Sequence, residues 1–561
     1  MKIRSIIYTL SLVTAMGAVC SCEETASSMV EFEEENTFSQ PSDTVYSVMG
    51  VIKKMQTIAD RTLLLGEIRG DLTSLTDHAS TDLQQLANFE ATTENVYNNA
   101  RDYYAIIQNC NFFIARADTS FKKNHQSVFL KEYAVMKTYR AWTYMQLALA
   151  YGKVPFFTQP LLTEKEADVN LHPKYDIRQI AEFFINDIKE FVDTDYPYYS
   201  SIGGLNSTKF FIPVRVLLGD LCLWAGRYDE AAKYYHDYLT ATGKAQPIGD
   251  NSVNWMDNKW LNISVSPYTA LFNNSNAETL TFIPMEEEEY DGTISYLDDV
   301  FNSTEDNNYY NQATLSQALV DLSTAQRYVM VQTDVNTQLP DTITPPDTLV
   351  YETQLQRGDL RLHAVVNTRS VTNTTTTDYS TVRQTIQKFS TSRTVTTYRL
   401  AHVYLRYAEA LNRAGYPHAA FAVLKYGLYP LNIQQYIPEE ERTAAGDLLT
   451  FSQYQFSREN TIGIHSRGSG VANADTTYAI PSTLTEKADI IEYVEDKIFD
   501  EMALEECFEG QRFGELVRIA MRRGDNAYLA RRIASRNGAE NFNNELYTRL
   551  LQESNWYLPL E

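Results

Sequence analysis

The stretch PVRVLLGDLCLWAGRYDEAAKYYHDYLTATG, residues Pro213–Gly243, decides the fold class. Its apolar first half ends at Ala225-Gly226, where a tight turn is expected, and a second amphipathic run opens at Tyr228. The small pair Ala231-Ala232 follows the turn. Small residues let two helices cross closely while large residues fill the space between them, which is the pattern of a tetratricopeptide unit. The stretch therefore predicts a pair of antiparallel helices.

The same order of features occurs again in LAHVYLRYAEALNRAGYPHAAFAVLKYGL, residues Leu400–Leu428, with Gly415 at the turn and Ala419-Ala420 after it. Any all-helical protein can form such hairpins, but the repeated small–turn–small order favours a repeat scaffold. An isolated helix pair cannot bury its apolar face, so further and less regular pairs are expected. Apolar residues at helical spacing in 94–116, 127–152 and 176–192 supply them. We expect a mainly α, tetratricopeptide-like scaffold, with repeats at about 94–240, 399–430 and 490–535.

Two irregular segments, about 241–398 and 431–486, interrupt this helical pattern. LPDTITPPDTLVYET (339–353) is typical of a loop, because prolines and turn residues dominate it. VVNTRSVTNTTTTDYSTVRQTIQKF (365–389) alternates Thr and Val around a turn and predicts a short β-hairpin. Long insertions in a compact protein usually carry function, so we expect ligand-binding residues in these two segments.

The N-terminus has the parts of a bacterial secretory signal. Lys2 and Arg4 precede an apolar run from Ile6 to Val19 that is shorter than the roughly 20 residues needed to span a bilayer. Ser21 and Cys22 close it as in a lipoprotein signal, in which the cysteine becomes the acylated first residue. Ordinary secretion with two incidental cysteines is the alternative, and Cys20 is a competing attachment point. We expect a signal at 1–21, a lipidated acidic tether at 22–40 and a single domain at 41–561.

The charge and the cysteines narrow the class of protein. Removing the signal, with its two positive charges, takes the formal net charge from −24 to −26. Such a surface repels nucleic-acid phosphates and anionic lipid, so we expect no nucleic-acid partner and attachment through acyl chains alone. Cys110, Cys222 and Cys507 lie in apolar helical patterns and are odd in number, which predicts buried, unpaired thiols rather than a disulfide framework.

Nothing in the sequence forms a catalytic motif. The eight histidines are scattered without metal-ligand spacing, and GIHSRGSG (463–470) is neither a nucleophile elbow nor a phosphate loop. We therefore expect no enzyme activity, no cofactor and no metal. MEEEEYDG (285–292) is typical of a solvated acidic run. The remaining alternative is a structural calcium site that uses this run or Asp298-Asp299, although no EF-hand spacing is present.

Five stretches, in order, resemble the motifs of the SusD/RagB family. They are MKTYRAWTYMQLALAYGKVPFF (136–157), QRGDLRL (356–362), LAHVYLRYAEALNRAG (400–415), EMALEECFEGQRFGELVRIAMRRGD (501–525) and NWYLPL (555–560). The resemblance runs from the signal to the last residue. It implies a SusD-like fold in which tetratricopeptide-like repeats carry the ligand-binding insertions.

The resemblance also implies a function. Members of this family are lipoproteins at the surface of the outer membrane that capture a nutrient, usually a glycan, during polysaccharide utilisation. They deliver it to a SusC-type TonB-dependent transporter, against which the repeats pack. Glu23 and Glu24 resemble the acidic export tag of such lipoproteins. Two alternatives remain open, namely the same role with peptide ligands, as in RagB-like members, and a structural or interaction role without a ligand.

Ligand residues are expected among exposed aromatic and polar side chains, because a ring can cover the apolar face of a sugar while amides and carboxylates bind its hydroxyls. The chain has 38 tyrosines. In the family the segment before the first long helix helps to build the ligand face, and here that segment is 66–99. Tyr97 stands near where members often place a stacking tryptophan, and its identity favours the peptide alternative. The expected ligand residues are Arg69, Asp71, Asn88, Tyr97, Trp255, Trp260, Tyr290, Tyr296, Tyr309 and Tyr310. Trp255 and Trp260 could equally hold their loop to the body.

Overall fold

The computed structural model describes residues 41–289, 292–302, 311–334, 337–372, 380–389 and 393–560. The signal, Cys22 and the tether lie outside the described residues, as do Tyr290, Tyr309 and Tyr310. The expectations for these positions therefore stay predictions.

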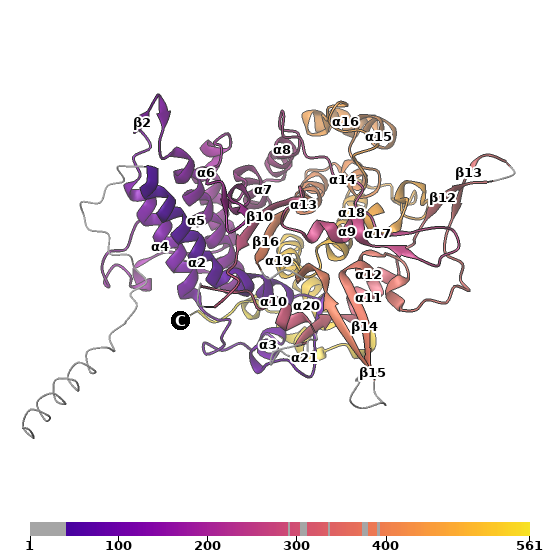
Figure 1. The fold of residues 1–561 in the computed structure, drawn as a ribbon, viewed down its shortest axis with the longest axis horizontal. Helices are drawn as coiled ribbons and strands as arrows, with labels where there is room; N and C mark the ends of the chain where they lie inside the picture. The colour runs from indigo at the N-terminus through magenta and orange to yellow at the C-terminus, as the bar shows by residue number, and fades with distance from the viewer. Residues whose placement is uncertain are drawn as a thin grey trace, which may run out of the picture.

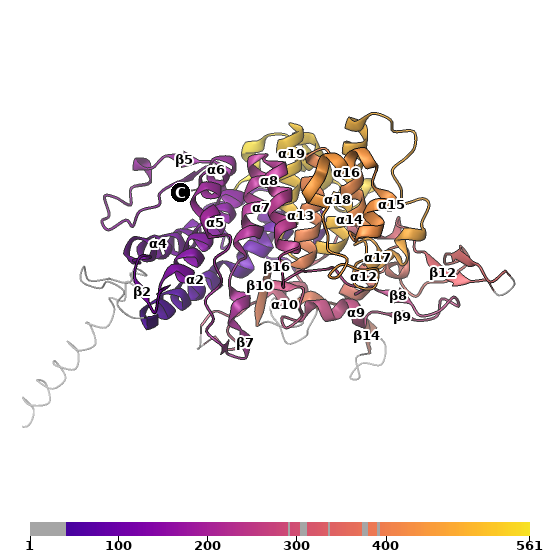
Figure 2. The same ribbon diagram turned by 90° about the horizontal axis from the view of Figure 1, so that it is seen from above.

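A row of paired helices forms the body of the molecule (Figures 1 and 2). Along the row, α4 packs on α5, α5 on α6, α6 on α7, α7 on α8, α8 on α13 and α13 on α14, and α18 packs on the last two. The long helices are α2 (Pro41–Glu67), α4 (Ala100–Arg116), α5 (Leu130–Tyr151), α6 (Ile177–Ile188), α7 (Val214–Ala225), α8 (Tyr228–Leu239), α13 (Leu400–Arg413), α14 (Pro417–Lys425), α18 (Lys487–Glu506) and α19 (Arg512–Arg523). The predicted helical-repeat scaffold is confirmed.

The two helix pairs recognised in the sequence form as predicted. Gly226, with φ +76°, and Gly415, with φ +96°, adopt turn conformations that other residues rarely adopt. At the α7–α8 crossing, a Cβ on Gly219 would lie 2.4 Å from a ring carbon of Tyr235, so only glycine allows this approach. Because α8 contacts α13, the two pairs are neighbours in space although 160 residues, 240–399, separate them in the chain.

Local chemistry sets where the helices begin. The Asp176 side chain accepts hydrogen bonds from the backbone N–H groups of Arg178 and Gln179, and the Gln179 side chain accepts one from the backbone N–H of Asp176. These bonds make a capping box at the start of α6. The periodic pattern that begins near residue 94 becomes helical only at Ala100, because backbone turns end at Asn95 and Asn98. The periodicity thus located the helix but not its first turn.

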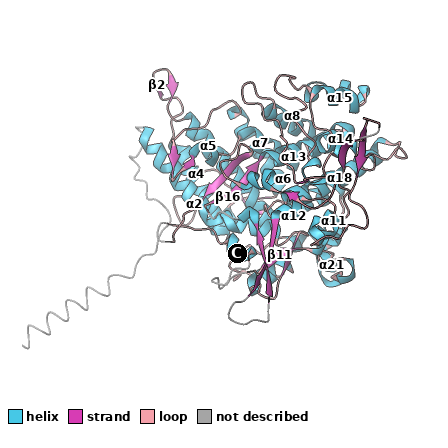
Figure 3. Ribbon diagram, turned by 45° about the vertical axis from the view of Figure 1, so that its right-hand side comes forward, coloured by secondary structure: helices cyan, strands magenta, loops and turns pink. Residues whose placement is uncertain are grey.

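Strands occur only as short antiparallel pairs among the described residues (Figure 3). β14 (Val366–Thr372) pairs with β15 (Ser380–Ile386), so the predicted Thr/Val hairpin is confirmed. β12 (Met330–Thr333) pairs with β13 (Pro340–Ile343), so the expectation of a loop throughout 339–353 is wrong at its start. Pro340 is compatible with a strand here because it stands first in a strand of a two-stranded sheet.

The other strand pairs are β1 (Thr73–Leu75) with β11 (Ala313–Leu315), β2 (Lys122–Lys123) with β3 (Gln126–Ser127), β4 (Val154–Pro155) with β5 (Lys174–Tyr175), β6 (Ser201–Ile202) with β7 (Leu205–Asn206), β8 (Asn254–Trp255) with β9 (Ile263–Ser264), and β10 (Thr279–Pro284) with β16 (Thr394–Arg399). The remaining helices are α3 (Thr81–Ala87), α9 (Ser266–Thr269), α10 (Leu297–Phe301), α11 (Gln317–Thr324), α12 (Arg361–Val365), α15 (Pro430–Tyr436), α16 (Glu439–Ala445), α17 (Ser466–Ser469), α20 (Asn526–Ala534) and α21 (Asn544–Leu550).

A buried charged cluster joins the insertions to the helical body. Glu505 of α18 is fully buried and accepts hydrogen bonds from Arg361 at 3.0 Å, Arg399 at 2.8 Å and Arg467 at 2.8 Å. These arginines come from the start of α12, the end of β16 and the 463–470 segment. Their remaining partners are Glu278, Asp359, Glu501 and Glu509. We call these eight residues the Glu505 cluster.

The cluster brings together two of the five motifs and the 463–470 segment. QRGDLRL supplies Asp359 and Arg361, which pair at 2.8 Å, and the 501–525 motif supplies the carboxylates. The GIHSRGSG segment supplies Arg467, and its His465 pairs with Glu501 at 2.9 Å. The histidine and the glycines of that segment therefore have a structural role. Cys110, Cys222 and Cys507 are buried and unpaired, as predicted.

Candidate ligand-binding sites

Arg69 and Asp71, two expected ligand residues, are buried and bind other parts of the protein. The Arg69 guanidinium donates to the carbonyl oxygens of Leu65 at 2.8 Å and Trp556 at 3.2 Å, and it lies 4.1 Å from the centre of the Phe513 ring. Asp71 accepts from the Arg512 guanidinium at 2.6 Å and 3.1 Å. Burial alone would raise the pKa of Asp71, but Arg512 holds it below its ordinary value. The expectation that these two side chains are exposed to a ligand is wrong, because Arg69 joins α2 to the C-terminal segment and Asp71 binds Arg512 at the start of α19.

Trp255 and Trp260 are also buried, so of the two alternatives the exposed rings are wrong and the rings hold the loop to the body. Their rings meet edge to face at 6.0 Å, and Trp260 meets Tyr328 in the same way at 6.3 Å. The Tyr328 hydroxyl accepts a hydrogen bond from the backbone N–H of Trp255. The two tryptophans attach the β8–β9 hairpin to the segment before β12 and leave little ring surface free.

Tyr296 contacts Asp60 of α2, and Tyr97 lies near enough for the charge of Asp60 to act on its phenol. The Asp60 carboxylate accepts hydrogen bonds at 2.7 Å from the Ser295 hydroxyl and from the Tyr296 backbone N–H. Tyr97 is half-buried, and burial together with the charges of Asp82 and Asp60 raises the pKa of Tyr97 to about 12. The Tyr296 side chain is 43% exposed. We call Asp60, Asp82, Tyr97, Ser295 and Tyr296 the Asp60 surface.

The chemistry of the Asp60 surface suits a hydroxylated ligand. It combines two phenol rings with a carboxylate, and burial raises the pKa of Asp60 to about 6 although its two hydrogen bonds lower it. Asp60 is therefore a hydrogen-bond acceptor above that pH and also a donor below it. Asn88 is exposed at the end of α3, where its carbonyl accepts from Arg549 at 2.5 Å. None of the described contacts links Asn88 to Asp60.

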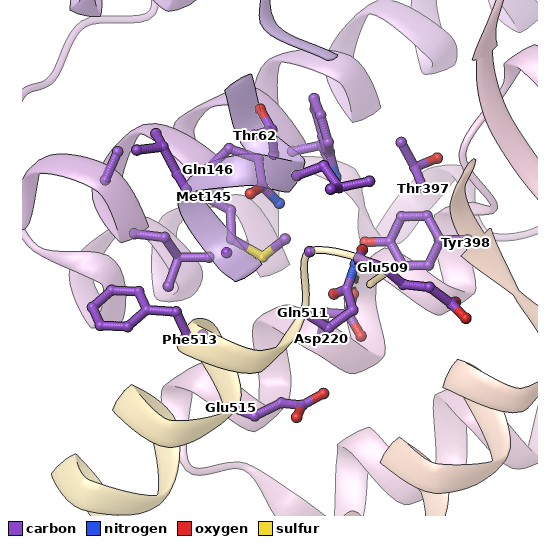
Figure 4. Close-up of a pocket in the computed structure, with 18 of the residues that line it drawn as sticks. Thr62, Met145, Gln146, Asp220, Thr397, Tyr398, Glu509, Gln511, Phe513 and Glu515 are labelled. Carbon is purple, nitrogen blue, oxygen red and sulfur yellow. Dashed lines mark hydrogen bonds between the residues drawn. The ribbon is translucent and has the colours of Figure 1, made fainter. Parts of the chain in front are cut away.

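A central cavity of about 80 Å³ lies between α2, α5, α7 and β16 (Figure 4). Thr62, Gln146 and Tyr398 line it from different elements. Asp220, one of its lining groups, already accepts from Tyr235, Tyr398 and Arg406 at 2.6 Å to 2.9 Å. Ligand pockets typically enclose about 300–1,000 Å³, so this cavity is too small for a sugar.

A larger pocket of about 850 Å³ opens beside the ends of α7 and α8. It is lined by five separate stretches, within 192–196, 208–215, 237–242, 244–246 and 277–280, and we call it the α7–α8 pocket. These stretches are separate in the sequence, and no pattern in it indicates the pocket. Tyr196 and Tyr238 are its aromatic residues, and they had no mark in the sequence that set them apart from other tyrosines.

The described residues offer neither a metal site nor a membrane-spanning helix. No three His, Cys, Asp or Glu side chains in the described ranges lie close enough together to hold a metal ion. Asp298 accepts a hydrogen bond from Asn302, and the structure does not describe residues 290–291 of the acidic run. No described helix has the length and apolar character needed to cross a membrane.

Comparison with known proteins shows similarity in structure only. No family model matches this chain, and no curated protein does. A SusD superfamily protein from Bacteroides thetaiotaomicron is 14% identical, with 86% of this chain and 89% of that chain covered and a TM-score of 0.54. A SusD-like carbohydrate-binding protein from Bacteroides vulgatus is 17% identical, with 86% and 84% covered and a TM-score of 0.53.

A further SusD superfamily protein from Bacteroides vulgatus is 12% identical, with 91% of this chain and 92% of that chain covered and a TM-score of 0.54. The similarity in each case spans most of both chains, so it concerns the whole architecture rather than one helix pair. The chain has the SusD-like fold.

Proposed function

We propose that this protein is an outer-membrane lipoprotein, exposed at the cell surface, that captures a glycan and delivers it to a SusC-type TonB-dependent transporter. The observation that carries the proposal is the SusD-like fold, shared over 86% of this chain with a protein described as carbohydrate-binding. In this role the protein binds its ligand without chemical change.

The Asp60 surface is the proposed ligand site. Tyr97 and Tyr296 offer ring faces for the C–H groups of a sugar, and Asp60 offers hydrogen bonds to its hydroxyls. These groups come from α2, from the segment before α4 and from the segment before α10, so a ligand would contact three parts of the chain at once.

The first test is calorimetric titration of the chain from residue 23 onward with neutral glycans, acidic glycans and mixed peptides. We expect saturable binding of one glycan class, and we expect Tyr97→Ala or Tyr296→Ala to weaken it at least 10-fold. Tyr454→Ala is the matched control, because Tyr454 is 90% exposed and lies outside the Asp60 surface. Binding of peptides alone would support the RagB-like alternative, and binding of neither class would contradict ligand capture by this protein.

The lipid anchor and the transporter partner have to be tested in cells that express the full chain. We expect metabolic labelling with a radioactive fatty acid to mark the wild-type chain and to fail with Cys22→Ser, while Cys20→Ser remains labelled. Protease added to intact cells should degrade the wild-type protein, and a transporter of the TonB-dependent class should co-purify with it after mild solubilisation. An unlabelled, protease-protected protein without such a partner would contradict the proposed location and delivery.

A further inference from the structure

The α7–α8 pocket has the size of a ligand site and lies outside the Asp60 surface. Its volume of about 850 Å³ falls within the range of about 300–1,000 Å³ that is typical of small-molecule sites. No residue of the Asp60 surface lines it. Its wall is formed by the N-terminal end of α7, the C-terminal end of α8 and the start of β10, and the row of helices holds these elements in place.

Two tyrosines line the pocket with unused hydroxyl groups. Tyr196 and Tyr238 are both half-buried and packed on the core, and the Tyr196 ring lies 6.1 Å from that of Phe211. Neither phenol hydroxyl makes a hydrogen bond to any residue that the structure describes. A half-buried hydroxyl without a protein partner is available to a ligand, and the adjoining ring offers an apolar face.

The charged groups of the pocket are balanced and already paired. Asp193, Asp195 and Asp237 face Lys209, Arg215 and Lys244, so the formal charge of the lining is zero although that of the whole chain is −24.

Each cation has a partner within the protein. Arg215 pairs with Asp193 at 2.5 Å and Lys244 with Asp195 at 3.5 Å. The Lys209 ammonium donates to two backbone carbonyls at 2.9 Å and 2.6 Å. The third carboxylate, Asp237, pairs with Lys233 at 3.1 Å.

This arrangement favours uncharged ligands. An acidic sugar or a peptide terminus meets no cation without a partner in the pocket, whereas an uncharged ligand leaves every ion pair intact. The polar side chains that remain for a ligand are neutral, namely the two tyrosine hydroxyls, the hydroxyls of Thr194 and Thr242, and the Gln246 amide. Hydroxyl and amide groups beside aromatic rings match a neutral sugar.

We infer that the α7–α8 pocket is a second binding site, separate from the Asp60 surface, for an uncharged oligosaccharide. The inference rests on the proposed function for the class of ligand, a glycan, and goes beyond it in the place of binding and in the preference for uncharged sugars. A chain with two separate sites would hold two parts of one polysaccharide and thereby gain avidity.

The test is the paired substitution Tyr196→Phe with Tyr238→Phe, which removes two oxygen atoms and keeps both rings. The probes are malto-, cello-, xylo- and manno-oligosaccharides, with oligogalacturonates and a mixed peptide digest for comparison. We expect the affinity for the neutral oligosaccharide that binds this pocket to fall about 10-fold, since each lost hydrogen bond contributes modestly. The melting temperature should stay unchanged, because neither hydroxyl bonds to the described protein.

Two controls make the result specific. Tyr198→Phe lies in the same stretch of chain, but Tyr198 does not line the pocket and is 71% exposed, so it should leave the affinity unchanged. Binding to the pocket should also be insensitive to sodium chloride, because an uncharged ligand has no charges for salt to screen.

The outcomes separate this inference from the proposed function. If glycan binding is lost in Tyr97→Ala and Tyr296→Ala but is unaffected by the paired substitution, the proposed function stands and the second site is refuted. If oligogalacturonates or peptides bind best and lose affinity in the paired variant, the charge argument is wrong. If no neutral oligosaccharide binds, the inference fails, and the peptide titration and the co-purification of a transporter still decide the proposed function.

Discussion

Replacing Glu505 with glutamine tests how the fold is held together. Glu505 is fully buried and receives hydrogen bonds from the guanidinium groups of Arg361, Arg399 and Arg467, while the Tyr268 hydroxyl lies 3.3 Å away. Glutamine keeps the shape of the side chain but loses its negative charge. Its NH₂ group also directs N–H donors at arginine groups that are themselves donors. The three buried guanidinium groups then lose one of the carboxylates that balance their charge.

The size of the effect follows from burial. Removing one partner from a buried ion pair costs roughly 3–5 kcal/mol, and we take about 4 kcal/mol for Glu505→Gln. The entropy of unfolding is about 2.1 cal/mol/K per residue, which gives about 1.1 kcal/mol/K for a domain of about 520 residues. The expected fall in melting temperature is therefore about 4 °C.

The pH dependence of this effect has a definite sign. Burial alone would raise the pKa of Glu505, but Arg467, Arg399 and Arg361 hold it well below its ordinary value of 4.5. A carboxyl group with a lowered pKa in the folded state contributes stability that is present above the unfolded value and is lost as the pH falls towards the folded value. The difference in the free energy of unfolding between wild type and Glu505→Gln should therefore become smaller below about pH 4.5.

The assay is differential scanning calorimetry at pH 7 and pH 4, with urea unfolding as a second measurement. Glu492→Gln is the matched control, because Glu492 lies on the same helix and is exposed. It should change stability by less than about 0.5 kcal/mol. A Glu505→Gln variant that melts within 1 °C of wild type at pH 7 would refute the reasoning, since the three arginines would then not depend on this carboxylate.

Three further outcomes are expected. Gly219→Ala should lower stability by about 1–3 kcal/mol in urea unfolding, because its Cβ would lie 2.4 Å from the Tyr235 ring, whereas Gly50→Ala, with nothing within 4 Å, should not destabilise. Trp260→Ala should lower the free energy of unfolding by about 3–5 kcal/mol and leave the glycan affinity unchanged. A selective loss of affinity would instead show that Trp260 binds the ligand. Burial lowers the pKa of His402 from 6.5 to about 4 against the opposing effect of Glu509, so the protein should lose up to about 3 kcal/mol of stability as the pH falls from 6.5 to 4. His402→Gln should abolish that part of the pH dependence, and an unchanged profile would contradict the assignment.

The helical scaffold could be predicted from the sequence because its signals are local. Gly226 and Gly415 mark turns through their own backbone freedom, and the spacing of apolar residues within a dozen neighbours marks the helices around them. The β14–β15 hairpin was likewise predictable from alternation and a turn. The β12–β13 hairpin was missed because its second strand begins at a proline, which sequence reasoning treats as a loop signal.

The accessibility of the expected ligand residues could be predicted only in part. Tyr296 contacts Asp60 and Tyr97 lies within reach of its charge, but Arg69, Asp71, Trp255 and Trp260 are buried against segments far away in the chain. Arg69 contacts Trp556, and Asp71 contacts Arg512, each more than 400 residues away. The local sequence around a polar or aromatic residue in an irregular segment does not show whether its side chain is exposed to solvent or buried against a distant part of the chain.

The sequence by itself determined the helix pairs, the turns and the order of the motifs, since each depends on residues close together in the chain. Only the tertiary structure decided which tyrosines are accessible, that two motifs and the 463–470 segment meet at Glu505, and that five stretches enclose the α7–α8 pocket. The physical reason is that burial is a property of the whole packed molecule. A side chain is buried by the segments that pack over it, and these segments can be distant in the sequence. The residues next to it in the chain therefore do not reveal its burial.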